Sequence, residues 1–561
     1  MLKFKRISLV INEKKHIVLG FFTLWFALAL LQSALMPLSG EEAYYWLFSE
    51  SLDWGYLDHP PAVAFFAHLG YVLFGNELGV RLLSTLLSTI TLVLLLDLVG
   101  RRHFRTFVFA SLGLLAVHAG SFLVKTDVPL LFFEVLFFWF YKKYLKQEDW
   151  TAIVGLAIAI AGMFLSKYHG VLVVLFTVAS NFRLLQKRSF WLIVLLTAIL
   201  MLPHLLWLIE HDFSSIRFHL QGRADISFKW SNVIGYIISQ PLVLGPLVSI
   251  PMGIALFKRG YADLFSKALL FVLVGVLIFF FIQSFRVFIH KHWTSIALVP
   301  LLVLTVEVLH SDNKLSFYLR RLSRITIVVL VLFRLYLIVD YVPDSLKGKT
   351  EPLHDWDKWA QSVNALSGGM PVVFINSYEN ASRYQFYTGL PAHTLSTYYF
   401  NNTQFDQWGY EDYFRNRSAL VIHHKRNQQG FQTVDAPNSA QIHYKRVRNF
   451  NTLSKLWVEV NQIETASQGD RITANLTISN PYPFDIEFSE NSAVRLKLFT
   501  LKGERVLSEH LISSEFNLAA HSERVETISV AIGQLDENTQ LRFGIEVGDL
   551  PATINSHRIH L

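Results

Sequence analysis

Long apolar segments dominate the first 340 residues of the chain, and short polar stretches separate them. Most of these segments approach the roughly 20 residues that a helix needs to cross a bilayer. A shorter apolar segment, residues 62–75, is expected to form a helix along the membrane surface. The pattern predicts about eleven membrane-spanning helices, at residues 17–36, 78–99, 105–123, 128–141, 150–166, 170–182, 190–209, 232–257, 266–284, 294–309 and 325–341.

The hydrophobic pattern changes after Tyr341. Residues 345–450 mix helix-like and strand-like stretches, and Met370–Asn376 is typical of a buried strand. In residues 471–478 apolar and polar side chains alternate with the period of two that marks a half-buried strand. The sequence therefore predicts a polytopic α-helical membrane protein with C-terminal extracytoplasmic domains: a transmembrane domain at 1–344, an α/β domain at 345–450 and a β-sandwich at 451–561.

The composition agrees with a chain that is partly solvated by lipid. Hydrophobic residues make up 52% and charged residues 17% of the 561 residues, whereas soluble domains have about 25% charged residues. This composition argues against an ordinary soluble enzyme. The chain contains no cysteine, which excludes disulfide scaffolds, thiolate metal sites and cysteine nucleophiles.

The charged residues indicate how the chain lies in the membrane. The formal net charge is +7, and the basic residues concentrate in every second loop, for example at Arg101, Arg102 and Arg105. The positive-inside rule puts these loops and the N-terminus in the cytoplasm, and the other loops and the C-terminal domains outside. We expect a multi-pass membrane protein that needs no nucleic acid as a partner, because membrane anchoring already explains its basic charge.

The polar side chains that can carry chemistry cluster in the predicted outer loops. The first cluster follows the first span and contains Glu41 and Glu42, and the second ends at Asp58-His59-Pro-Pro61. Two carboxylates at a membrane surface can serve as general base and metal ligand. The alternative for any single cluster is that a loop is simply polar.

These two clusters resemble a known outer loop. Glu41-Glu-Ala-Tyr-Tyr-Trp46 and Asp53-Trp-Gly-Tyr-Leu-Asp-His-Pro-Pro61 are similar to the first outer loop of polyprenyl-phosphate-dependent glycosyltransferases of the GT-C class. This class includes the protein O-mannosyltransferase-like family and the aminoarabinose transferases that modify lipid A. The resemblance covers roughly residues 17–425 and continues in order through Lys125-Thr-Asp127, Ser166-Lys167-Tyr-His169, the loop from Glu210 to Arg223, His290-Lys-His-Trp293, and Asn376-Ser-Tyr378 with Phe386-Tyr-Thr-Gly389.

The resemblance implies catalytic roles for three carboxylates. Glu41 stands where the class has its base, which deprotonates the acceptor hydroxyl for an inverting attack on the sugar. The class usually has Asp there, so the extra methylene group of Glu41 is a departure. Glu42 is the alternative base, and one of the two glutamates is expected to cap a surface helix. Asp127 is expected to position the acceptor or to hold the outer loop.

Other residues are candidates for the donor phosphate and for a metal. Arg223 is the main phosphate candidate because a guanidinium binds phosphate through two hydrogen bonds. Asp58 and His219 match the positions of metal ligands, which implies a divalent metal, zinc or manganese. The alternative for this pair is two solvated loop residues, and the alternative for the cations is snorkelling to lipid headgroups. The further phosphate candidates are His59, which replaces a Lys of the lipid A enzymes, Lys167, Arg286 and Lys291.

The sequence thus predicts a glycosyltransferase that moves a sugar from a polyprenyl-phosphate carrier to an extracytoplasmic acceptor. That acceptor is lipid A or another part of lipopolysaccharide, a polysaccharide or a protein. One rival function is a transporter or flippase for a lipid-linked sugar, which is expected to show polar sites at mid-membrane and inverted repeats. The other rival is a non-catalytic envelope scaffold whose β-sandwich binds partners.

Overall fold

The computed structural model describes residues 2–219, 228–342, 352–423, 430–438, 440–465, 471–489, 492–502, 505–513, 515–533 and 539–560. It divides into two compact units. The membrane unit comprises Met1–Phe213 and Phe228–His354, and the C-terminal unit comprises Ser214–Ser227 and Asp355–Leu561. The last boundary lies ten residues beyond the one expected at 344, and part of the loop after Glu210 groups with the C-terminal unit.

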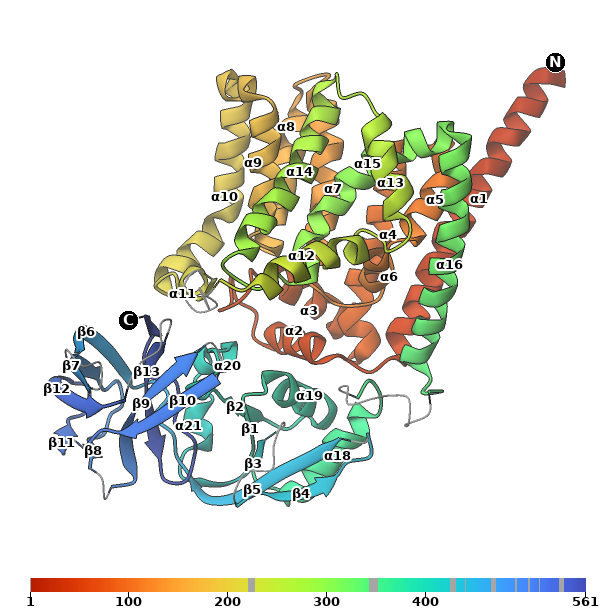
Figure 1. Cartoon of the computed structure of the whole chain (residues 1–561). Helices are drawn as coiled ribbons and strands as arrows, with labels where there is room; N and C mark the ends of the chain where they lie inside the picture. Colours follow the sequence, from red (N-terminus) through yellow and green to blue (C-terminus); the bar gives the residue numbers. More distant parts are fainter. Residues whose placement is uncertain are drawn as a thin grey trace. The chain divides into compact units, whose positions relative to one another are not determined.

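The membrane unit is a bundle of helices at the positions that the hydrophobic segments predict (Figure 1). Among the described residues, five helical segments are long and apolar enough to cross a membrane: Lys15–Leu35, Glu77–Val99, Arg188–Glu210, Leu264–Ser284 and Lys291–Ser311. The structure therefore supports a multi-pass membrane protein, whereas the number of eleven spans stays a prediction. The helices are α1 (Leu2–Leu35), α2 (Gly40–Glu50), α3 (Ala62–Phe74), α4 (Glu77–Val99), α5 (Phe104–Leu112), α6 (Leu115–Gly120), α7 (Asp127–Tyr144), α8 (Trp150–Ser166), α9 (Gly170–Ser180), α10 (Arg188–Glu210), α12 (Trp230–Val243), α13 (Ser249–Lys258), α14 (Leu264–Ser284), α15 (Leu298–Ser311) and α16 (Asn313–Ile338), with a 3-10 turn, η4 (Lys291–Ala297).

Two expected spans are interrupted. Segment 105–123 forms α5 and α6, which are separated at Gly113, and segment 232–257 forms α12 and α13, which are separated near Gly245. Gly245 has a φ of 94°, which glycine adopts without strain. The two interruptions touch: a Cβ atom on Gly113 would lie 2.5 Å from Val248, and one on Gly245 would lie 2.4 Å from the same side chain. The interruptions therefore depend on a contact between distant segments.

The C-terminal unit begins with a mixed sheet of order β2-β1-β3-β5-β4. The strand expected at Met370–Asn376 is β1, which is buried along its length and parallel to β2 and β3. Helices α18 (Trp356–Ser367) and α19 (Tyr378–Thr388) contact each other, and α19 contacts β1 and β2. The strands are β1 (Val372–Ile375), β2 (Ala392–Leu395), β3 (Arg417–His423), β4 (Gln432–Asp435) and β5 (Gln441–Phe450).

The expected β-sandwich follows. Sheet β10-β9-β13-β14 and sheet β12-β7-β6 contribute to one apolar core, with β11-β8 beside them. Strand β7 shows the predicted alternation of exposed and buried residues, but β13 is almost entirely buried on both faces. The segment that follows β2 covers the second face of β13. There Arg542 donates hydrogen bonds to the carbonyl oxygens of Tyr398 and Phe400. The strands are β6 (Trp457–Thr465), β7 (Arg471–Ser479), β8 (Ile486–Phe488), β9 (Val494–Lys502), β10 (Arg505–Leu511), β11 (Phe516–Leu518), β12 (Glu523–Ala531), β13 (Gln540–Val547) and β14 (Ile559–His560).

Two buried ionisable groups in the C-terminal unit are expected to give its stability opposite pH dependences. Burial raises the pKa of the Asp406 carboxyl to about 6, and burial lowers the pKa of the His393 imidazole to about 4. The contribution of Asp406 to the free energy of unfolding is present below the pKa that its carboxyl has in the unfolded chain, and it is lost as the pH rises through 6. The contribution of His393 to the free energy of unfolding is present above pH 6.5 and is lost as the pH falls to 4. Each contribution amounts to about 3 kcal/mol.

On acidification from pH 7 to 4 the two contributions offset each other, so the native unit is expected to change little. Asp406→Asn is expected to leave a unit that loses about 3 kcal/mol over this range, and His393→Leu a unit that gains about as much. Hydrogen exchange of the β1 and β2 amides in the purified chain, corrected for intrinsic exchange rates, measures these energies. Parallel pH profiles for the two variants would contradict the prediction.

Candidate functional site

The first polar loop forms a buried helix, α2, at the end of the bundle where α1 ends (Figure 1). Ser39 caps this helix: its hydroxyl accepts from the Glu42 amide, and the Glu42 carboxylate accepts from the Ser39 amide. This reciprocal capping box satisfies two amide groups at the helix start. One of the two glutamates is thus a helix cap, as the sequence predicts, and it is Glu42.

Glu42 is also the partner of a buried arginine. Arg81 on α4 is fully buried and donates to both carboxylate oxygens of Glu42, at 2.8 and 2.7 Å. The same guanidinium donates to the carbonyl oxygens of Ser33, Met36 and Pro37 at the end of α1. Burial raises the pKa of Glu42, but Arg81 and the amides of Val124 and Ser39 lower it by more, so the carboxyl lies below its usual range. Glu42 is an ionised structural group.

Glu41 has a different environment. Its side chain is 43% exposed, and its carboxylate lies 3.3 Å from the ammonium of Lys125. Burial lowers the pKa of Lys125, but the carboxylates of Glu41 and Asp127 raise it by more, so the lysine stays protonated. Glu41 is therefore a carboxylate that solvent reaches and that has a cation beside it.

Asp127 and Lys167 form the neighbouring part of the site. Asp127 begins α7, and Lys167 follows the last residue of α8. The Lys167 ammonium donates to both oxygens of Asp127 at 3.0 Å, and the Ser295 hydroxyl donates to one of them at 2.8 Å. This arrangement joins α7, α8 and η4 through a buried ion pair. Lys167 is thus bound to a carboxylate, which reduces the positive charge it can offer to a phosphate.

The second polar loop, residues 51–61, is held in place by buried side chains. Tyr56 is fully buried, stacks on Phe48 with 4.1 Å between ring centroids, and donates to the Phe48 carbonyl oxygen. His204 on α10 donates from Nδ1 to the Trp54 carbonyl oxygen at 2.6 Å. Because Nδ1 carries the proton in this bond, Nε2 accepts from the Tyr168 hydroxyl at 3.3 Å. The loop that carries Asp58 is therefore fixed to α2 and α10.

The closest approach in this loop occurs at Gly55. A Cβ atom there would lie 2.4 Å from the indole of Trp207, so Gly55→Ala is expected to push the loop off α10 and to lower the free energy of unfolding by about 1–3 kcal/mol. Gly20→Ala on α1 is the control, because nothing lies within 4 Å of the added atom. Thermal unfolding of the two purified variants measures the difference. Equal melting temperatures would contradict the expectation.

Asp58 and His59 lie at the end of this loop. The two side chains are 16% exposed, His59 Nε2 lies 3.9 Å from Asp58 Oδ2, and the Tyr45 hydroxyl lies 3.2 Å from His59 Nε2. His219 belongs to the other compact unit. Among the described residues no group of three His, Asp or Glu side chains is arranged to hold a metal ion. These residues do not supply a complete ligand set, so the metal pair Asp58–His219 stays a prediction.

Two further candidates for binding the donor phosphate are Lys291 and Arg223. Lys291 is exposed at the start of η4. Arg223, the main candidate, lies outside the described residues. The structure also adds residues that the motifs did not single out: Arg81, His204 and Ser295 contact Glu42, the Trp54 carbonyl and Asp127. Arg81 and His204 occur within apolar helices, and a polar residue in such a segment was the only signal that pointed to them.

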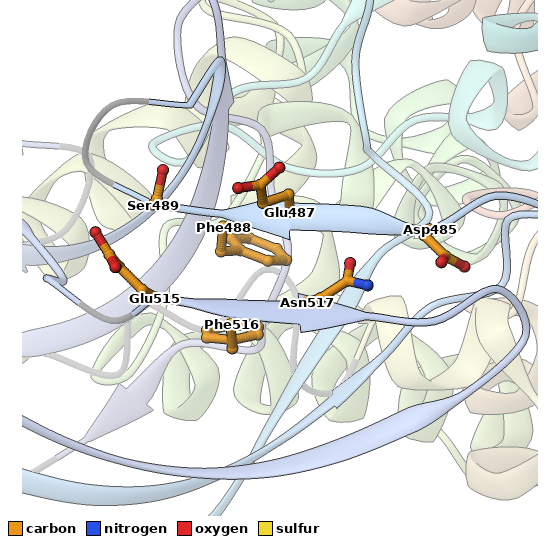
Figure 2. Close-up of a pocket in the computed structure, with 7 residues that line it drawn as sticks. All are labelled: Asp485, Glu487, Phe488, Ser489, Glu515, Phe516 and Asn517. Atoms are coloured by element: carbon orange, nitrogen blue, oxygen red, sulfur yellow. The ribbon is translucent and has the colours of Figure 1, made fainter.

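A surface hollow lies in the C-terminal unit over strands β8 and β11 (Figure 2). Its polar side chains include Asp485, Glu487 and Glu515, and none of the predicted site residues that the structure describes lines it. The rings of Phe488 and Phe516 are buried and stack with 4.6 Å between their centroids. Because like charges repel, an acidic surface of this kind is unsuited to a phosphate-bearing donor.

Comparison with known proteins gives a sequence match to the first part of the chain. Residues 58–207 match the family described as dolichyl-phosphate-mannose-protein mannosyltransferase. The chain is also 27% identical over 314 residues to the lipid A galacturonosyltransferase RgtD of Rhizobium johnstonii. That match covers 52% of this chain, and it spans 65% of the length of the relative.

The fold is similar to that of a solved membrane protein. The structure of ArnT from Cupriavidus metallidurans bound to undecaprenyl phosphate matches with a TM-score of 0.55 and 15% identity, and it covers 76% of this chain and 98% of ArnT. The apo structure of the same protein matches with a TM-score of 0.53. The matched segment, the apolar helices and this shared fold agree with the GT-C-like membrane fold that the sequence predicts.

Proposed function

We propose that this chain is a membrane glycosyltransferase that transfers a sugar from a polyprenyl-phosphate donor to lipid A or a related envelope lipid. The observation that carries the proposal is the joined cluster of Glu41, Lys125, Asp127 and Lys167 at one end of the bundle. Such a cluster lets the apolar chain of a lipid donor stay in the bilayer while its charged head reaches polar groups. The matched proteins, a lipid A galacturonosyltransferase and an ArnT bound to undecaprenyl phosphate, support the same substrate classes.

In the proposed reaction Glu41 accepts the proton of the acceptor hydroxyl. The resulting oxygen forms a bond to the anomeric carbon as the bond from that carbon to the phosphate oxygen breaks, which inverts the configuration. The electron pair of the broken bond stays with the polyprenyl phosphate. Lys125 orients the Glu41 carboxylate through their ion pair, and exposed cations such as Lys291 stabilise the negative charge of the leaving phosphate.

The charge pattern of the loops supports an orientation for this reaction. Basic loops on one side and the Glu41 cluster on the other support a site outside the cytoplasm and an N-terminus inside. We propose a bacterial inner membrane as its location, because the motifs of the outer loops resemble those of the bacterial branch of the class. Glu41 and Asp127 keep the roles that the sequence predicts for them, whereas Glu42 is assigned to the scaffold because Arg81 and the capping box engage it.

The test is a transfer assay on the purified full chain in lipid nanodiscs. The chain is incubated with lipid A and a panel of polyprenyl-phosphate sugars, with a galacturonate donor included because of the matched relative. Mass spectrometry is expected to show one donor consumed, with equal amounts of glycosylated lipid and free polyprenyl phosphate formed. A transporter or a scaffold consumes no donor, so a folded protein that leaves the whole panel intact contradicts the proposal.

A further inference from the structure

A second polar cluster lies within the helices and includes none of the side chains described so far. Arg334 is half-buried on α16, four residues before the helix ends at Ile338. Its Nε donates to the side-chain oxygen of Gln32 on α1 at 2.5 Å. The guanidinium also lies over the rings of Trp25 and Phe122, at 5.4 and 5.0 Å from their centroids. Helices α1 and α16 run side by side here (Figure 1).

No carboxylate in the part of the chain that the structure describes forms an ion pair with Arg334. An arginine within a membrane segment is costly unless it is paired or faces water. The Gln32 amide and the two aromatic rings are neutral, so they only partly compensate the charge. Arg334 therefore lacks a negatively charged partner from the described residues.

Two buried donors beside Arg334 are also unused. Gln32 is 2% exposed and Trp25 is 7% exposed, yet Gln32 Nε2 and Trp25 Nε1 have no hydrogen-bond partner among the described residues. Buried polar groups in native proteins almost always have a partner. The two residues are seven positions apart on α1, which puts them on the same face of the helix. Together with Arg334 they present only N–H donors, which is the arrangement that an anion with several oxygens requires.

Exposed apolar side chains surround this cluster. On α1, Leu28 and Leu35 are 50% and 53% exposed and lie on the helix face of Gln32. On α16, Val331 is 45% exposed and lies one turn before Arg334. An anion that fits here must carry apolar chains, because only a lipid satisfies both the donors and the apolar surface.

We propose that Arg334, Gln32 and Trp25 bind the phosphate of a membrane lipid between α1 and α16. The phosphate belongs either to a polyprenyl phosphate or to a phospholipid. His118 lies beside Trp25, with 5.4 Å between ring centroids. Its Nε2 donates to the Leu112 carbonyl oxygen, so its buried Nδ1 carries a lone pair. A phosphate monoester that retains one proton satisfies this lone pair and a diester does not, which favours a polyprenyl phosphate.

The test counts the lipids that stay bound to the delipidated full chain in native mass spectrometry. The probes are undecaprenyl phosphate, dioleoyl phosphatidylglycerol and the uncharged polyprenol. Arg334→Gln is expected to lower the affinity of this site for undecaprenyl phosphate at least about tenfold and to remove one bound lipid per chain. Gln32→Leu is expected to act in the same direction. Arg324→Gln, which removes an exposed cation from the same helix, is the control and is expected to change nothing.

The count separates this site from the proposed donor site. If the chain also holds a donor near Glu41, the wild type binds two phosphate lipids and Arg334→Gln binds one. If the proposed function is wrong, the wild type binds one phosphate lipid and Arg334→Gln binds none. Competition by phosphatidylglycerol assigns the site to phospholipid and still supports it. A folded Arg334→Gln or Gln32→Leu variant that keeps every bound lipid, or equal retention of polyprenol, overturns the proposal.

Discussion

Replacing Glu41 with glutamine is expected to lower the rate of sugar transfer by about 10²- to 10⁴-fold while leaving the fold intact, because this is the usual contribution of a positioned general base. Glutamine has the same size and stays neutral, so it cannot take the proton of the acceptor hydroxyl. The side chain is 43% exposed and forms one ion pair, with Lys125, so the change removes little packing. The loss is expected in kcat, with the KM for both substrates nearly unchanged.

Two further variants test whether the loss comes from the Glu41 carboxylate itself. Glu50→Gln changes an exposed carboxylate at the other end of α2 and is expected to keep the wild-type rate. Glu41→Asp moves the carboxylate back by about 1.5 Å and is expected to be slower than the wild type but faster than Glu41→Gln. Initial rates and melting temperatures are measured on the same preparations. A Glu41→Gln protein with near-normal turnover shows that another group is the base.

The helices of the membrane unit were predictable because each one must bury or expose a long apolar surface, and that requirement is visible in local sequence. The interruptions in segments 105–123 and 232–257 were not predictable in this way. They arise where Gly113 and Gly245 both meet Val248, and a contact between distant residues leaves no periodic signal. Similarly, alternation predicts that one face of β13 is exposed, but Arg542 and its carbonyl partners cover that face.

The sequence offered candidate residues for the site but could not divide the roles between neighbours. Glu41 and Glu42 are adjacent and identical in chemistry, so sequence alone left both as the base or the cap. Their roles are separated by a residue 39 positions away, since Arg81 reaches Glu42 and not Glu41. Lys167 is an evident cation in the sequence, but its partner Asp127 lies 40 positions earlier.

Breaking the Glu42–Arg81 pair is expected to have the largest effect on stability. Glu42→Gln leaves a fully buried guanidinium without its counter-charge, which typically costs about 3–5 kcal/mol of unfolding free energy. Arg81→Lys is also expected to destabilise the chain, because an ammonium group cannot reach Glu42 and the three backbone carbonyl oxygens at once. Thermal and denaturant unfolding of the purified variants measure both losses. Arg101→Gln, which breaks an exposed pair with Asp97, is the control and is expected to cost little.

The same pair gives the wild type a distinct acid sensitivity. The folded-state pKa of Glu42 is lowered, so its stabilising contribution is present above the unfolded pKa and is lost as pH falls. Glu42→Gln removes this group, so its stability is expected to fall less on acidification than that of the wild type. A double-mutant cycle with Arg81→Met is expected to show a coupling energy of about 1–3 kcal/mol.

The effect on transfer follows from what the pair holds together. Glu42 Oε1 also accepts from the Val124 amide, next to Lys125, and Glu42 itself follows Glu41. The ion pair therefore fixes the distance between the proposed base and its cationic neighbour. Glu42→Gln is expected to lower kcat even at temperatures where it is fully folded, and to do so less than Glu41→Gln. If a folded Glu42→Gln protein transfers at the wild-type rate, the pair stabilises the bundle but does not position Glu41.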